Sequence, residues 1–156
     1  MASITKHQEQ LTLAGAKIAL SAAEAKAKSM GIDFNIAIVD ASTYLLAFSR
    51  MPNAKLTSVS IAMDKAFTAA GHKVGTHMYK EAVWPGGAAY GLGNSNGGRF
   101  TTFAGGLPIV NGRGEVIGGI GASTGTPAQD QEVVQAGKDA VEAALKKGSG
   151  EFKSKL

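Results

Sequence analysis

The part of the sequence that decides the fold is Leu107-Pro108-Ile109-Val110-Asn111-Gly112-Arg113-Gly114-Glu115-Val116-Ile117-Gly118-Gly119-Ile120-Gly121-Ala122. Residues 107–110 and 116–122 are rich in strand-forming side chains, and a short polar connection with an Asn-Gly pair joins them. An Asn-Gly pair between two such runs is a strong signal for a β-hairpin. The stretch therefore predicts two neighbouring antiparallel strands.

Three more runs favour strands and, with the hairpin, predict one antiparallel sheet of about five strands. These runs are residues 34–39, 44–48 and 101–103. The polar residues 40–43 separate the first two runs and predict a second hairpin.

Helical patterns occupy both ends and the middle of the chain. The first helix is expected between Thr5 and Met30, with Thr5 or Thr12 as its N-terminal cap and Gly31 as its stop. Its apolar stripe consists of Leu11, Ala14, Ile18, Ala22 and Ala25. The second helix ends at Gly71, and its apolar residues are Val59, Met63, Ala66 and Ala70.

A third helix is predicted from its first residues. Thr126 is suited to cap it, Pro127 to take the first helical position and Gln129 to complete a capping box. The helix is expected to end near Lys147. This order of elements predicts a single α+β domain over residues 1–147, with helices flanking the sheet, and a flexible basic tail over residues 148–156.

The formal charge of the chain is +4, and four lysines against one glutamate in the last eleven residues supply +3 of it. A nucleic-acid-binding protein carries its basic residues as a patch on a folded face, so no nucleic-acid partner is expected. The chain contains no cysteine, which excludes disulfides, zinc–thiolate and iron–sulfur sites and a thiol nucleophile.

No apolar run approaches the ~20 residues that span a bilayer, and the N-terminus lacks the apolar core of a secretory signal. We therefore expect a cytoplasmic protein without membrane insertion. The last three residues, Ser154-Lys155-Leu156, match the peroxisomal import tripeptide. A peroxisomal location is expected if this tripeptide is a native signal.

Glycine is concentrated in the middle of the chain, where 14 of the 21 glycines lie between Gly86 and Gly125. Their spacing matches neither a dinucleotide-binding fingerprint nor a phosphate loop. The loop of residues 84–98 is long and glycine-rich, which is typical of a segment approached by a ligand or a partner. Trp84 and Tyr90 would flank a flat ligand beside the Gly97-Gly98 turn, or else anchor the loop to the core or to an oligomer interface.

The start of the last predicted helix and a set of carboxylates are further candidates. Backbone N–H groups at Gly125 and Thr126 would hold a carboxylate, a phosphate or a haem propionate, with close backbone packing as the alternative. The candidate catalytic carboxylates are Asp40, Asp130 and Glu132. Turn formation and the helix dipole are the structural alternatives for these acids.

The chain has three histidines, His7, His72 and His77, and none of their spacings matches a zinc site. A lone histidine is more often structural than a ligand. His7, beside the first predicted helix, is the histidine placed to reach a haem iron or a neighbouring subunit.

Several short motifs between Leu11 and Leu145 carry a family resemblance. They are Leu-Thr-Leu-Ala (11–14), Ile-Ala-Ile-Val-Asp (36–40), Ala-Phe-Ser-Arg-Met (47–51), Lys-Ala-Phe-Thr-Ala (65–69), Pro-Gly-Gly-Ala-Ala-Tyr-Gly (85–91), Asn-Gly-Gly (96–98), Phe-Ala-Gly-Gly-Leu-Pro (103–108), Gly-Gly-Ile-Gly-Ala-Ser-Thr-Gly-Thr-Pro (118–127) and Gln-Asp (129–130). In this order they resemble the GlcG/HbpS-like family, also called the haem-degrading domain family, which includes the C-terminal domain of PduO.

The resemblance implies a profilin-like sandwich on a five-stranded antiparallel sheet and a homo-oligomer of between two and eight copies. Some relatives bind haem, and degradation of haem or redox sensing is attributed to them. An N-terminal histidine is the proposed iron ligand, and His7 is the residue nearest to that position. A departure from the family pattern is Ser42-Thr43, where many relatives have glycine.

Two functions from different classes follow. The first is an oligomeric haem-binding protein, with haem degradation or redox sensing as its activity. The alternative is an enzyme or binding module for a small organic acid or aldehyde such as glycolate or glyoxylate. Its ligand would lie on the amides of residues 125–128, with Asp40, Asp130 or Glu132 polarising it. A third reading is a scaffold whose role is assembly, so enzymatic activity is left open.

Overall fold

The computed structural model of the chain describes residues 2–153, and side chains for residues 2–148. Four strands form one antiparallel sheet in the order β2-β1-β4-β3. The strands are β1 (Asn35–Asp40), β2 (Leu45–Arg50), β3 (Gly106–Val110) and β4 (Val116–Ser123). The helices are α1 (Leu13–Met30), α2 (Ser58–His72), η1 (Thr76–Met78), η2 (Lys80–Val83), η3 (Leu92–Asn94), α3 (Ser95–Gly98) and α4 (Pro127–Lys153). The predicted α+β domain is confirmed.

Both predicted hairpins are confirmed, because β1 pairs with β2 and β3 pairs with β4. The β3–β4 turn closes with a hydrogen bond from Gly114 N to Asn111 O of 2.9 Å. Gly114, and not the Asn-Gly pair, takes the positive φ of 77° that this turn needs. The third pairing, between β1 and β4, makes these two strands the centre of the sheet.

The predicted fifth strand over residues 101–103 is wrong, since the described chain forms a four-stranded sheet. The backbone N–H of Thr101 donates to the Thr68 hydroxyl of α2 at 2.9 Å. This segment is therefore tied to a helix, and sheet pairing begins only at Gly106, opposite Gly121.

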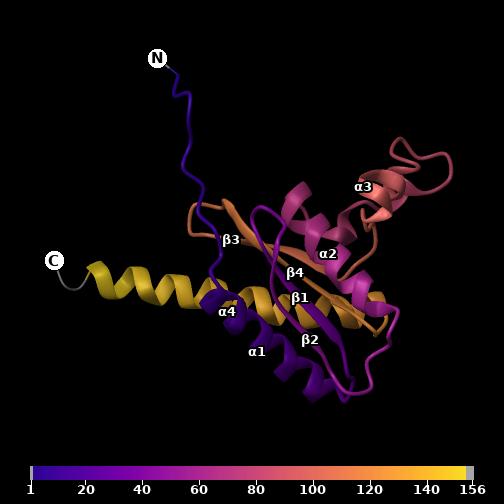
Figure 1. The fold of residues 1–156 in the computed structure, drawn as a ribbon, viewed down its shortest axis with the longest axis horizontal. Helices are drawn as coiled ribbons and strands as arrows, with labels where there is room; N and C mark the ends of the chain where they lie inside the picture. Colours follow the sequence, from indigo (N-terminus) through magenta and orange to yellow (C-terminus); the bar gives the residue numbers. More distant parts are fainter. Residues whose placement is uncertain (1, 154–156) are drawn as a thin grey trace.

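Helices cover both faces of the sheet, with α1 and α4 on one face and α2 on the other (Figure 1). Alternating side chains of β1 enter the two layers, because successive residues of a strand point to opposite faces. Ile36 and Ile38 pack in the core beneath α1 and α4. Ala37 and Val39 pack in the smaller core beneath α2.

The glycines of β4 allow α2 to lie close to the sheet. A Cβ atom at Gly121 would stand 2.1 Å from the carbonyl oxygen of Ala62, and one at Gly119 would stand 2.7 Å from that of Ala66. Side chains at these positions would push the helix away from the strand. The glycine-rich sequence of β4 is thus accounted for by close backbone packing.

The cap and the stop of α1 follow the sequence, whereas its buried face does not. Thr12, and not Thr5, caps the helix by accepting from Gly15 N at 3.2 Å, and Gly31 ends it. The buried face consists of Ala16, Ala19, Ala23 and Ala27. Of the predicted stripe, Leu11 is buried and Ala22 is half-buried, but Ala14, Ile18 and Ala25 are exposed. Alanines occur all round this helix, so the sequence does not single out one face. The buried face is the one on which α4 packs closely. At this contact, a Cβ atom at Gly137 of α4 would stand 2.9 Å from the carbonyl oxygen of Ala19.

The start of α4 has the predicted capping box. Thr126 N donates to Gln129 Oε1 at 2.9 Å, and Gln129 N donates to Thr126 Oγ1 at 3.3 Å. The helix runs to Lys153, beyond the end expected near Lys147. Helix propagation costs little once a helix exists, so Gly148 does not stop it. The predicted domain boundary at this residue stays a prediction.

Within the described part of the chain, no helix has the length and apolar character that crossing a membrane requires. The expected import tripeptide, Ser154-Lys155-Leu156, lies outside the described residues.

Candidate functional site

The glycine-rich loop projects from one end of the domain around α3 (Figure 1). Trp84 is 57% exposed and Tyr90 is 67% exposed, so neither ring anchors the loop in the core. Gly97 and Gly98 have positive φ angles, and a Cβ atom at either would meet nothing within 4 Å. The four predicted residues of this loop therefore stand on an open surface.

A different ring cluster, which the sequence did not reveal, joins α2 to the residues on either side of this loop. The hydroxyl of Tyr79 lies 2.9 Å from Nδ1 of His72. The ring of Phe100 stands edge-on to both, with centroids 5.1 Å from His72 and 5.4 Å from Tyr79. The three residues lie in different segments of the chain, so no local sequence signal marks the cluster.

The three candidate carboxylates do not meet. Asp40 ends β1 and accepts hydrogen bonds from Ser42 N at 2.8 Å and Tyr44 N at 3.1 Å, as a turn-forming aspartate does. Glu132 pairs with Lys26 of α1 at 3.0 Å on the surface. Asp130 is buried at the start of α4, near the opposite end of β1 from Asp40.

Asp130 is paired with a lysine that sequence reasoning missed. Its Oδ2 lies 2.6 Å from Nζ of Lys65, which also donates to Ala122 O at 3.0 Å and lies 4.7 Å from the centre of the Phe103 ring. Burial lowers the pKa of Lys65, and burial raises the pKa of Asp130, while their mutual hydrogen bond opposes both shifts. The pair links α2 to the start of α4.

The amides predicted to bind an anion already have acceptors in the chain. Gly125 N donates to Asp130 Oδ1 at 3.0 Å, and Thr126 N donates to Gln129 Oε1 at 2.9 Å. Side chains of the helix itself thus satisfy these two orphan donors. An incoming carboxylate would have to displace them.

His7 lies at the other end of the molecule, on the extended N-terminal segment. Residues 9–11 fix the base of this segment between the two hairpin turns. Glu9 pairs with Arg113 at 2.8 Å, Gln10 Oε1 accepts from Ala41 N at 2.8 Å, and Leu11 N donates to Ile117 O at 2.7 Å.

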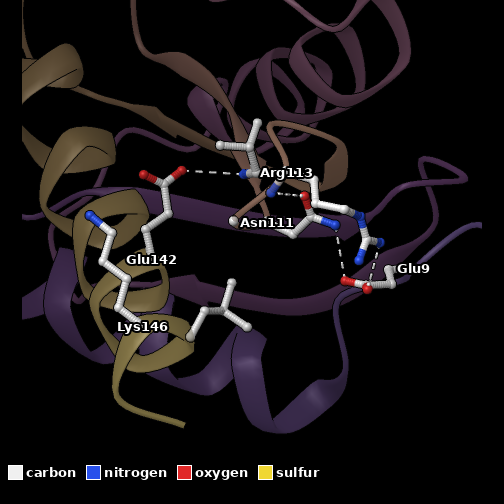
Figure 2. Close-up of a pocket in the computed structure, with 8 residues that line it drawn as sticks. Glu9, Asn111, Arg113, Glu142 and Lys146 are labelled. Atoms are coloured by element: carbon white, nitrogen blue, oxygen red, sulfur yellow. Dashed lines mark hydrogen bonds and ion pairs between the residues drawn. The ribbon is translucent and has the colours of Figure 1, made fainter. Parts of the chain in front are cut away.

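Glu9 is the centre of a polar network at the β3–β4 turn. Figure 2 shows its carboxylate facing Asn111 and Arg113, while Glu142 of α4 points toward β3. Hydrogen bonds from Asn111 and Arg113 lower the pKa of Glu9, and the hydrogen bonds of Arg113 and Asn111 lower that of Glu115. The network therefore holds both carboxylates ionised.

Three cavities lie around the base of the N-terminal segment, and Glu9 lines all three. The first, of about 270 Å³, lies between the β3–β4 turn and α4 (Figure 2). The second, of about 320 Å³, is lined by Lys6, His7, Gln8, Glu9, Lys73, Gly114, Glu115 and Val116. The third is an apolar groove of about 480 Å³ between α1 and α4.

The His7 cavity combines the imidazole of His7 with two ammonium groups and with the carboxylates of Glu9 and Glu115, which both pair with Arg113. A neutral imidazole is a common ligand of transition metals and haem iron. Lysine side chains such as Lys6 and Lys73 pair with carboxylate or phosphate groups. An anionic ligand that contains a metal would meet an imidazole and two ammonium groups here, beside two carboxylates that already pair with Arg113.

Comparison with known proteins agrees with the motifs. A family model described as haem degrading protein HbpS-like matches residues 11–139. The chain is 40% identical over 129 residues to an uncharacterised 15.0 kDa protein from the dhaT–dhaS intergenic region of Citrobacter freundii, covering 83% of this chain and 90% of that protein. It is 35% identical over 111 residues to protein GlcG of Escherichia coli K12, covering 71% of this chain and 78% of GlcG.

The chain also matches part of a larger protein, the corrinoid adenosyltransferase PduO of Citrobacter freundii. The identity is 38% over 114 residues, which is 73% of this chain but 34% of PduO. The match therefore spans about a third of PduO.

Solved structures have the same fold. The Klebsiella pneumoniae protein ORFY matches with a TM-score of 0.88 at 35% identity, over 92% of this chain and 98% of that one. A PduOC–haem complex matches with a TM-score of 0.79 at 34% identity, over 84% and 94% of the two chains. HbpS matches with a TM-score of 0.77 at 25% identity, over 89% and 95%. The chain belongs to the HbpS-like family of haem degrading proteins, the GlcG/HbpS-like family that its motifs resemble.

Proposed function

We propose that this protein binds haem as a homo-oligomer and that His7 is the ligand of the iron. Family membership supports the proposal, as does a relative solved in complex with haem, PduOC. The observation in this chain that carries it is the His7 cavity, which places an imidazole beside two lysines.

The residues of this cavity fit a haem group. His7 provides the axial nitrogen, Lys6 and Lys73 provide partners for the propionates, and Val116 provides an apolar contact. The volume of about 320 Å³ lies at the lower end of the range of ligand pockets, and the cavity is open to solvent, so part of a haem would lie outside it. Bound haem would supply an iron centre for redox chemistry at this end of the molecule.

Glu9 and Arg113 act as positioning residues in this proposal. Their ion pair of 2.8 Å holds the segment two residues after His7 against the β3–β4 turn. The backbone that carries His7 is therefore held in place before haem binds, which reduces the conformational entropy lost on binding.

Titration with hemin tests the proposal. The wild-type protein is expected to develop a Soret band, and His7→Ala to weaken the affinity by about tenfold or more because the iron–nitrogen bond is lost. His72→Ala is the matched control, since His72 is the exposed histidine beside Tyr79, and it should bind like the wild type. A flat wild-type titration would exclude haem binding, and an unchanged affinity of His7→Ala would exclude His7 as the ligand.

The alternative ligand, a small organic acid or aldehyde, has less support. The amides expected to hold its carboxylate donate to Asp130 and Gln129, and Asp40 and Glu132 lie elsewhere. A thermal-shift screen with glycolate and glyoxylate separates the two functions. Our proposal predicts stabilisation by hemin and none by these acids, and the reverse result would favour the alternative.

A further inference from the structure

The apolar groove between α1 and α4 has no role in the proposed haem site. Its apolar lining comes from Leu11, Ile18, Ile117, Val141 and Ala144. Ile18 is 42% exposed within it. The His7 cavity is bounded instead by Lys73, at the end of α2 on the opposite face of the sheet. Most of the apolar lining is buried at the bottom of the groove, while Ile18 is exposed at its edge.

The N-terminal segment, residues 2–8, offers an apolar side chain that its own domain leaves in solvent. The segment runs away from the sheet and the helices (Figure 1), and all its residues are exposed. Ile4 is 100% exposed. Among the described residues, the hydrogen bonds of this segment join only Ser3 to Thr5.

The groove of the same chain is not accessible to this Ile4 without a reversal of the backbone. Residues 9–11 are fixed by hydrogen bonds to Arg113, Ala41 and Ile117, so the chain enters the domain from the side of the hairpin turns. Ile4 would have to turn back within residues 5–8, which contain no helix or strand and run away from the domain (Figure 1). The same segment of a neighbouring copy has no such restriction.

We propose that the groove binds the N-terminal segment of a second copy, with Ile4 as the anchoring side chain. The inference rests on the self-association in the proposed function and assigns the surfaces that make it. A two-fold pair would exchange the segments reciprocally, each filling the groove of the other copy. Because His7 lies on the same segment, docking also orders the proposed iron ligand.

Disulfide trapping tests the contact without hemin. The chain has no cysteine of its own, so any disulfide must join two introduced cysteines and shows that they lie close together. After mild oxidation, Ile4→Cys/Ile18→Cys is expected to give a reducible band of dimer mass. The matched control is Ile4→Cys/Leu56→Cys, because Leu56 is 71% exposed just before α2, on the other face of the sheet. A product of monomer mass, or no more dimer than in the control, would overturn the proposal.

The mass in solution gives a second test. Light scattering should find at least two copies for the wild type and for Leu56→Asp, and a smaller mass for Ile4→Asp, because a carboxylate is costly to bury in an apolar groove. An Ile4→Asp protein with the wild-type mass would contradict the inference. Neither measurement contains hemin, so a failure of haem binding would leave both results interpretable.

Discussion

At the scale of single residues, the ion pair of Lys65 and Asp130 is buried inside the domain. The two side chains are 0% and 3% exposed, and their atoms are 2.6 Å apart. Each charge is compensated mainly by the other, because burial has removed both from water. The carboxylate also accepts from Gly125 N, so the pair fixes the entry to α4 as well as its packing on α2.

Removal of one partner should be far more harmful than removal of both. Lys65→Met leaves Asp130 buried without its counter-ion, and we expect a loss of about 3–5 kcal/mol in the free energy of unfolding. The double variant Lys65→Met/Asp130→Asn should recover more than half of this loss. Urea denaturation of the wild type, both single variants and the double variant measures the coupling. A cost below about 1 kcal/mol for Lys65→Met would contradict this account.

The network at the base of the N-terminal segment should make stability depend on acidic pH. Hydrogen bonds lower the pKa values of Glu9 and Glu115 from 4.5 in the folded protein. Their contribution is therefore complete above pH 4.5 and is lost as the pH falls through the lowered values.

Arg113→Gln should consequently lower the melting temperature at about pH 6, and this difference from the wild type should shrink at about pH 3. Arg50→Gln, which changes an exposed arginine at the end of β2, is the control. A difference between Arg113→Gln and the wild type that stays constant over this range would show that these carboxylates do not contribute.

Residue chemistry was predictable where it is local. The capping box of Thr126 and Gln129 and the turn-forming role of Asp40 depend on neighbours a few positions away. The Lys65–Asp130 pair joins residues that are 65 positions apart, so no short pattern marks it. Its one local sign is a lysine among the small buried residues Ala62, Ala66 and Ala69 of α2.

At the scale of elements, the contact of α2 with β4 depends on glycine. The helix backbone lies so close to the strand that a methyl group at Gly121 would overlap Ala62 O and would stand 2.5 Å from Ala66 N. Backbone atoms on both sides cannot yield as a flexible side chain would. The layer beneath α2 is therefore thin. Its buried side chains are alanines and one valine, and Phe48 and Met63 pack at its margin.

Gly121→Ala should destabilise the protein by about 1–3 kcal/mol through overpacking, or prevent folding. Gly112→Ala is the matched control, because a Cβ atom there meets nothing within 4 Å and its φ is not positive. Its effect should stay within about 0.5 kcal/mol. Thermal or chemical denaturation of the two variants decides the question, and equal stabilities would contradict the close approach of α2.

Elements were predictable to the extent that local sequence determines them. Turn residues marked both hairpins, and caps marked the starts of α1 and α4. The buried face of α1 and the fate of residues 101–103 depend on contacts with α4 and with Thr68 of α2. Such contacts come from distant parts of the chain and leave no periodic signal.

At the scale of the whole molecule, the predicted binding groups lie on separate segments. The glycine-rich loop and the N-terminal segment, to which His7 belongs, project from the domain in different directions (Figure 1). The sequence directed attention to the loop, because glycines and aromatics are conspicuous there. The cavity with an imidazole and two lysines became visible only when Lys73, far along the chain, lay beside residues 6–9.

The central claim is that His7 is the ligand of a bound haem iron. Resonance Raman spectroscopy of the ferrous haem complex, with ¹⁵N-labelled histidine in the protein, tests it most directly. We predict an iron–histidine stretching band that shifts with the label, disappears in His7→Gly and returns when imidazole is added to that variant. A labelled band that persists in His7→Gly would contradict the claim.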